Sequence, residues 1–144
     1  MAHTNPPAGV LTDLLASART IAVVGASSKP HRPSHRIFGY LKDAGYRVIP
    51  VNPSESEVLG EPAFSSLAEV LEPIDIVDVF RRPEHAPAVA ADAAAVGAGA
   101  LWLQQGISND RAAEIASAAG LTVVMNLCIA VVHRQLGIPR RDRE

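Results

Sequence analysis

The chain has 144 residues, of which 48% are hydrophobic and 19% are charged, and its formal net charge is −2. These values fit one globular domain with a buried core, and they give no overall attraction to nucleic acid. Its single cysteine, Cys128, excludes an internal disulfide and any multi-cysteine metal site, which fits a reducing compartment. The start has no signal-peptide pattern, and no apolar run reaches the roughly 20 residues of a membrane span. We therefore expect a cytoplasmic protein with no membrane contact.

Hydrophobic patterning predicts strands that alternate with helices. Before the first strand, residues 1–9 are Pro-rich and expected to be loose, and residues 10–18 have helical spacing. Short apolar runs rich in β-branched residues predict strands over residues 20–25, 46–51, 74–80, 100–104 and 121–125. Helical spacing, capping residues and Ala content predict helices over residues 34–44, 83–96, 108–119 and 129–136. Residues 139–144 form a charged tail.

This alternation predicts a doubly wound, Rossmann-like α/β fold, a three-layer sandwich around a mostly parallel sheet of about five strands. No linker or internal repeat divides the chain, so the domain is expected over residues 10–138. In such folds, ligands bind beyond the carboxyl ends of the strands, where the strand order reverses. The loops that would line this edge are Gly25–Ser34, Asn52–Pro53, Phe80–Pro83 and Gln104–Ser108.

The loop after the first predicted strand is rich in cations and contains no acid. Ser34 is expected to cap the following helix, whose N-terminal amides attract anions. For a loop in this position we favour phosphate binding over a merely solvated surface. Its polar and charged residues are Ser27, Ser28, Lys29, His31, Arg32, His35 and Arg36.

The same region lacks the features of common nucleotide sites. A dinucleotide turn needs further glycines after Gly25, and the second strand should end beside an acid that binds the ribose. Here that strand ends in Asn52-Pro53, with no carboxylate next to it, which weighs against NAD. No Gly-Lys-Ser/Thr follows Gly25, so there is no Walker-type loop. A nucleotide with an additional phosphate, such as NADP or coenzyme A, fits the cations better, and the residues alone leave both open.

Four stretches together resemble the small single-domain CoA-binding proteins, which are related to the CoA-binding domain of the succinyl-CoA synthetase alpha subunit and of acyl-CoA synthetases. They are "VVGASSKPHRPSHRIFGYLKDAGYRVIPVNP", "VLGEPAFSSLAEV", "DIVDVFRRPE" and "ALWLQQGI". The resemblance covers about residues 10–136. It implies a Rossmann-like domain that binds coenzyme A or an acyl-CoA, with no established reaction.

The resemblance also implies which residues meet the ligand. The implied contacts are Gly25, Ser27, Lys29 and Ser34 for the phosphates, Asn52 and Pro53 for the adenosine, Phe80, Arg81 and Arg82 for a third wall, and Gln104 and Gly106 for the pantetheine arm. The chemistry of the first loop adds Ser28 and Arg32 as hydrogen-bond donors to the phosphates. Family members commonly carry Asp-Arg-Cys after the last strand, where this chain has Asn126-Leu127-Cys128.

Five further residues have two interpretations each. We expect Cys128 to be a buried, inert thiol rather than the partner of a mixed disulfide with coenzyme A. For His133 a packing role is favoured over general base catalysis. For Asp75 and Asp78, hydrogen bonding to the structure is favoured over catalysis. Trp102 is expected in the core rather than against a cofactor.

No residue pattern identifies a catalytic group or a metal site, so a binding protein without catalysis is favoured. The alternatives are an NAD(P)-dependent reductase and an accessory CoA-binding subunit of a ligase-like partner. The Ala-rich helix offers a face for a homodimer, although packing against the sheet explains it equally well. The basic residues form one loop rather than a groove-reading helix, so nucleic-acid binding is not expected.

Overall fold

The computed structural model describes residues 3–141, and it confirms the predicted alternation of strands and helices. A two-stranded hairpin and two short 3₁₀ helices are added to it. In chain order the elements are α1 (Ala8–Ser17), β1 (Thr20–Val24), α2 (Pro33–Asp43), β2 (Arg47–Val51), β3 (Glu57–Val58), β4 (Glu61–Pro62), η1 (Leu67–Glu69), β5 (Ile76–Val79), η2 (Pro83–His85), α3 (Ala86–Ala95), β6 (Ala100–Leu103), α4 (Asp110–Ala118), β7 (Thr122–Val124) and α5 (Ile129–Gln135).

The main sheet is parallel and has the strand order β2-β1-β5-β6-β7. From β1 the chain steps outward to β2, and it then returns to the other side of β1 and proceeds through β5, β6 and β7. The order therefore reverses between β1 and β5, and the loops after these two strands diverge there. The predicted doubly wound α/β fold with a sheet of about five strands is confirmed.

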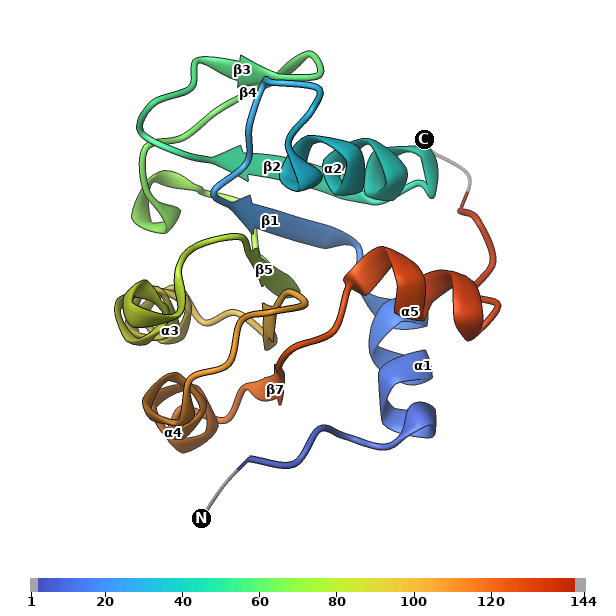
Figure 1. Cartoon of the computed structure of the whole chain (residues 1–144), viewed down its shortest axis with the longest axis vertical. Coiled ribbons are helices and arrows are strands. Elements are labelled where there is room, and N and C mark those ends of the chain that lie inside the picture. The colour runs from blue at the N-terminus through green and yellow to red at the C-terminus, as the bar shows by residue number, and fades with distance from the viewer. Residues whose placement is uncertain (1–2, 142–144) are drawn as a thin grey trace.

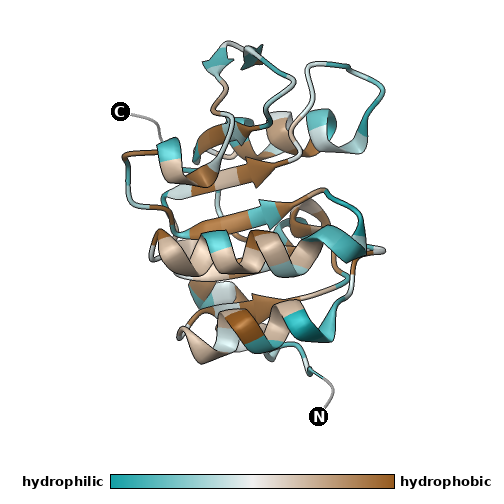
Figure 2. Cartoon of the chain, turned by 90° about the vertical axis from the view of Figure 1, so that its left-hand side faces the viewer, coloured by the Kyte–Doolittle hydropathy of each residue, from teal (hydrophilic) through white to brown (hydrophobic). Residues whose placement is uncertain are grey.

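Helices cover both faces of the sheet, which gives the expected three layers (Figure 1). On one face, α3 and α4 pack on the strands through alanines and other small apolar residues. On the other face, α1, α2 and α5 bury larger side chains such as Leu15, Phe38 and Ile129. Every residue of β1 is buried, as expected for a central strand covered on both sides. Figure 2, viewed from the side of α3 and α4, shows mostly hydrophobic strands and largely hydrophilic loops.

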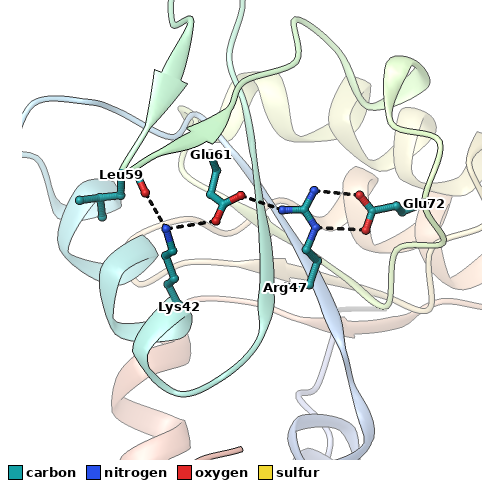
Figure 3. A network of polar contacts seen from close by, with 5 residues as sticks. All are labelled: Lys42, Arg47, Leu59, Glu61 and Glu72. Atoms are coloured by element: carbon teal, nitrogen blue, oxygen red, sulfur yellow. Dashed lines mark hydrogen bonds and ion pairs between the residues drawn. The ribbon is translucent and has the colours of Figure 1, made fainter. Parts of the chain in front are cut away.

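An ion-pair network fastens the β3–β4 hairpin to the rest of the domain (Figure 3). The Lys42 ammonium of α2 donates to the Leu59 carbonyl and lies 3.1 Å from the Glu61 carboxylate. The Arg47 guanidinium, at the start of β2, pairs with Glu61 and makes two hydrogen bonds to Glu72. Since these groups are partly exposed, the network orients the hairpin more than it stabilises the fold.

Two helix N-caps differ from the prediction. The N-cap of α2 is Arg32 rather than Ser34, because Pro33 occupies the first helical position, where its missing N–H costs nothing. Ser34 lies inside the first turn and is buried. The N-cap of α4 is Asn109 rather than Ser108, and its side chain accepts a hydrogen bond from the Ala112 amide.

The chain ends also make specific contacts. Within the segment expected to be loose, the Asn5 side chain donates to the Met125 carbonyl and accepts from its amide, and α1 already begins at Ala8. Asn5 thus binds just after the end of β7, because its side-chain amide matches both main-chain polar groups of Met125. Residues 1–2, and residues 142–144 of the charged tail, lie outside the described residues. Within residues 3–141, no helix has both the length and the hydrophobicity to cross a membrane.

Candidate ligand-binding site

A cavity of about 1010 Å³ opens at the carboxyl ends of β1, β2, β5 and β6, around the point where the strand order reverses. Ligands of doubly wound folds bind at this position. All four loops chosen from the sequence contribute to its wall. The predicted site residues that line it are Gly25, Ser27, Ser28, Lys29, Arg32, Ser34, Asn52, Phe80, Arg81 and Gln104.

Three predicted residues lie outside the lining. Pro53 and Arg82 are exposed beside the cavity, and Arg82 precedes the 3₁₀ helix η2. Gly106 donates its backbone N–H to the Asn126 Oδ1 atom at 2.7 Å. Asn126 adopts a positive φ of 59°, which asparagine tolerates better than most residues. The pair joins the loops after β6 and β7, so Gly106 contributes to the wall's shape rather than to its surface.

Gly25 is required where β1 meets the cavity. Its φ is +90°, and a Cβ atom added there would lie 2.4 Å from the Phe80 carbonyl oxygen. The loops after β1 and β5 therefore approach each other more closely than any side chain at residue 25 would permit. This close approach explains why the loop needs a glycine at residue 25.

The β1–α2 loop is held by its own hydrogen bonds. The Ser27 Oγ accepts from the Lys29 amide at 3.1 Å, and the Ser27 carbonyl contacts His35 Nδ1 at 2.9 Å. The Arg32 amide donates to the Lys29 carbonyl at 3.0 Å. In the first turn of α2, Pro33 has no N–H and the His35 amide donates to the Arg32 carbonyl, so the amide of the buried Ser34 is the one left without a backbone acceptor. A preordered loop that ends beside the Ser34 amide and hydroxyl is suited to phosphate oxygens.

Asn52 ties the loop after β2 to the loop after β1. Its Nδ2 donates to the Ala26 carbonyl at 2.8 Å, and its Oδ1 accepts from the Ser54 amide at 2.9 Å. Asn52 thus joins the two loops and also lines the cavity, and its place beside the adenosine stays a prediction.

The charged side chains that line the cavity are cationic, with one exception that the sequence analysis missed. Lys29, Arg32, Arg36 and Arg81 line it, and Glu55 is the one carboxylate among the described lining residues. Glu55 Oε2 accepts from the Ser28 amide at 2.9 Å. This hydrogen bond, helped by the charge of Lys29, holds the pKa of the Glu55 carboxyl below its usual value. This contact joins the loop after β1 to the segment that follows β2.

Gln104 forms the wall on the β6 side. It is only 5% exposed, yet it lines the cavity. Its Oε1 accepts from the Ile129 amide at the start of α5, at 3.0 Å, so the amide nitrogen is left as a donor. Other lining residues that the sequence analysis did not select are Pro33, Ile37, Ser54, Gln105 and Ile107.

Cys128, expected to be a buried thiol, is partly exposed and lines the cavity. The reason is its place just before α5, at the carboxyl edge of the sheet, where its apolar sequence neighbours turn inward and it does not. The packing role of His133 is confirmed: it is buried, and its Nδ1 lies 2.8 Å from the Tyr40 hydroxyl. Trp102 is fully buried in the core, and its indole N–H donates to the Leu127 carbonyl.

The two aspartates have different environments. Asp75 precedes β5, and its carboxylate accepts from the amides of Arg19 and Thr20, as expected for a hydrogen-bonding role. For Asp78 that expectation is wrong. It is fully buried within β5, and neither carboxylate oxygen has a hydrogen-bond partner among the described residues. Burial raises the pKa of this carboxyl well above its usual value, so the protonated form is favoured.

A second cavity, of about 830 Å³, lies at the opposite edge of the sheet, beside Arg19, Arg47 and the C-terminal segment Ile138–Arg141. Strands of doubly wound folds present their amino ends there, away from the ligand-binding edge. Within residues 3–141, no three His, Cys, Asp or Glu side chains lie close enough together to hold a metal ion.

Comparison with known proteins gives one family. The sequence model of the family described as "CoA binding domain" matches residues 19–134. The uncharacterized protein YneT of Bacillus subtilis is 46% identical over 129 residues, which cover 90% of this chain and 96% of that protein. The alpha subunit of the ADP-forming acetate–CoA ligase II of Pyrococcus furiosus is 37% identical over 67 residues, covering 46% of this chain and 15% of that subunit. The chain thus spans only a small part of the ligase relative.

Solved structures of similar length share the fold. A hypothetical protein from Pyrococcus horikoshii superposes with a TM-score of 0.89 at 34% identity, over 94% of this chain and 99% of that one. A protein from Thermus thermophilus superposes with a TM-score of 0.87 at 40% identity, over 91% of this chain and 99% of that one.

Proposed function

Because this chain belongs to the CoA-binding domain family, we propose that it binds coenzyme A or an acyl-CoA in the carboxyl-edge cavity and catalyses no reaction of its own. The phosphates would lie on the β1–α2 loop and the first turn of α2, and the pantetheine arm would run past Gln104. The chemistry of this binding is ionic and hydrogen-bonded at the phosphates and apolar along the arm.

One observation carries the proposal. The cavity at the strand-order reversal collects four cationic side chains, Lys29, Arg32, Arg36 and Arg81, beside the first turn of α2. Within residues 3–141, none of these four cations pairs with a carboxylate at ion-pair distance. A diphosphate with a further ribose phosphate is the kind of ligand that needs this many cations. The cavity volume is at the upper end for small-molecule sites, as a ligand of this length requires.

The proposal is tested by titrating the purified protein with coenzyme A in a calorimeter. Lys29→Ala and Arg32→Ala should each weaken binding by about tenfold, since one charge-assisted contact is lost. Both variants should also show a smaller loss of affinity when salt is raised. Arg111→Ala, which changes an exposed arginine of α4, is the matched control and should bind as the wild type does. Unchanged affinity in both loop variants would refute the assignment of the phosphates to this loop.

The reductase alternative makes a different prediction in the same titration. A reductase would bind NADPH or NADH in this cavity and would not respond to coenzyme A. Binding of coenzyme A with a Kd at least tenfold below that of NADPH supports the proposal, and the reverse order supports the alternative.

A further inference from the structure

Glu55 is an acid where a phosphate site is expected to have none. Its carboxylate accepts the backbone N–H of Ser28 at 2.9 Å, within the loop that follows β1. Backbone amides of this loop are the donors that a doubly wound fold offers to a diphosphate. One N–H group donates to one strong acceptor at a time. A phosphate oxygen that takes the Ser28 amide must therefore displace the Glu55 carboxylate.

The position of this carboxylate is built into the loop after β2. The Glu55 amide donates to the Asn52 carbonyl at 3.2 Å, which closes a turn from Asn52 to Glu55. The Asn52 side chain accepts from the Ser54 amide within this turn and donates to the Ala26 carbonyl of the β1 loop. The turn thus carries Glu55 across to the β1 loop, and the contact with Ser28 follows from an ordered backbone.

We propose that Glu55 is an intramolecular competitor of the ligand's phosphate, and that it sets the affinity of the site by occupying the Ser28 amide until a diphosphate displaces it. This inference rests on the proposed binding of coenzyme A. A ligand that makes further contacts along the cavity compensates for the displacement, whereas a small inorganic anion does not. Glu55 consequently lowers the affinity of the loop for every phosphorylated ligand, so a long ligand with further contacts still binds, whereas free phosphate or diphosphate binds only weakly.

Glu55→Gln tests the inference, because a neutral amide oxygen accepts from the Ser28 amide more weakly than a carboxylate does, and therefore competes less with a phosphate oxygen. We expect this variant to bind coenzyme A about fivefold more tightly than the wild type at low salt, as expected for removing one like charge near the phosphate in a solvated site. The gain should shrink at high salt. It should be equally large for dephospho-CoA, which keeps the diphosphate, and absent for pantetheine, which has no phosphate.

Inorganic diphosphate provides a second readout. It should compete with coenzyme A for Glu55→Gln at concentrations several-fold lower than for the wild type. Glu57→Gln is the matched control, since Glu57 is an exposed glutamate of the adjacent β3 that does not line the cavity. It should leave both affinities unchanged.

The outcomes separate this inference from the proposed function. If the wild type does not bind coenzyme A, the proposed function itself is overturned. If the wild type binds coenzyme A and Glu55→Gln binds it equally well or more weakly, the inference alone is overturned, and a weaker affinity would make Glu55 a direct ligand contact. A gain confined to coenzyme A, with none for dephospho-CoA, would overturn the placement of the diphosphate at Ser28.

Discussion

Asp78 should make the stability of this domain fall as the pH rises. The side chain is fully buried, and its carboxyl has no hydrogen-bond partner among residues 3–141. Burial raises its pKa in the folded protein, whereas the unfolded chain loses the proton near the ordinary pKa of an aspartate, 3.8. Above that pH the folded state holds one proton more than the unfolded state. The free energy of unfolding then falls by up to about 1.4 kcal/mol per pH unit until the folded carboxyl also ionises.

The change to make is Asp78→Asn, which keeps the size of the side chain and removes the titration. Urea unfolding measured from about pH 5 to pH 8 should give a variant whose stability relative to the wild type increases steadily with pH. Asp92→Asn, on the exposed surface of α3, is the control and should follow the wild-type curve. Parallel curves for the wild type and Asp78→Asn over this range would refute the assignment of a buried, protonated carboxyl.

Three further changes test other contacts. Gly25→Ala should destabilise the domain by about 2 kcal/mol or more and abolish coenzyme A binding, because the new Cβ would meet the Phe80 carbonyl at a φ of +90°; a normal urea midpoint would contradict this. Tyr40→Phe leaves the His133 ring without its hydroxyl partner and should cost about 1 kcal/mol, measured in the same way. Burial lowers the pKa of His133, so its contribution to stability should decline as the pH falls below about 6.5, where the unfolded histidine takes up a proton. Arg47→Ala breaks the ion pairs of Figure 3 and should cost no more than about 1 kcal/mol, with a smaller effect at high salt.

The fold could be predicted because its signals are local. Each main strand is a short apolar run, and α3 is rich in alanine, the strongest helix former. The errors at helix starts also had local causes. Pro33 is favoured at the first helical position, so the sequence contained the signal that α2 begins before Ser34. Asn109 and Ser108 are both good N-cap residues, and only the hydrogen bond to the Ala112 amide distinguishes them.

Asp78 could not be predicted, because its partners depend on the strand order. A buried carboxylate is normally paired, so a hydrogen-bonding role was the reasonable expectation. In the sheet its neighbours in register are Val23 of β1 and Trp102 of β6. Valine has no polar group, and the indole N–H already donates to the Leu127 carbonyl. The missing partner is a property of the assembled sheet and of no single segment.

The contact of Glu55 in the candidate site could not be predicted either, because it also depends on how distant segments come together. The sequence analysis searched for an acid directly beside the end of β2, found Asn52-Pro53, and inferred that the ribose lacks its acceptor. The turn closed by Asn52 instead brings a carboxylate back to the β1 loop from three residues further on, a contact between residues 27 positions apart. That carboxylate binds an amide of the phosphate loop, so its presence does not restore the acid expected for an NAD ribose. In the binding mode that we propose, it makes the charge of the ligand, rather than its ribose hydroxyls, the property to which this cavity responds, and the comparison of dephospho-CoA with pantetheine in Glu55→Gln measures that response directly.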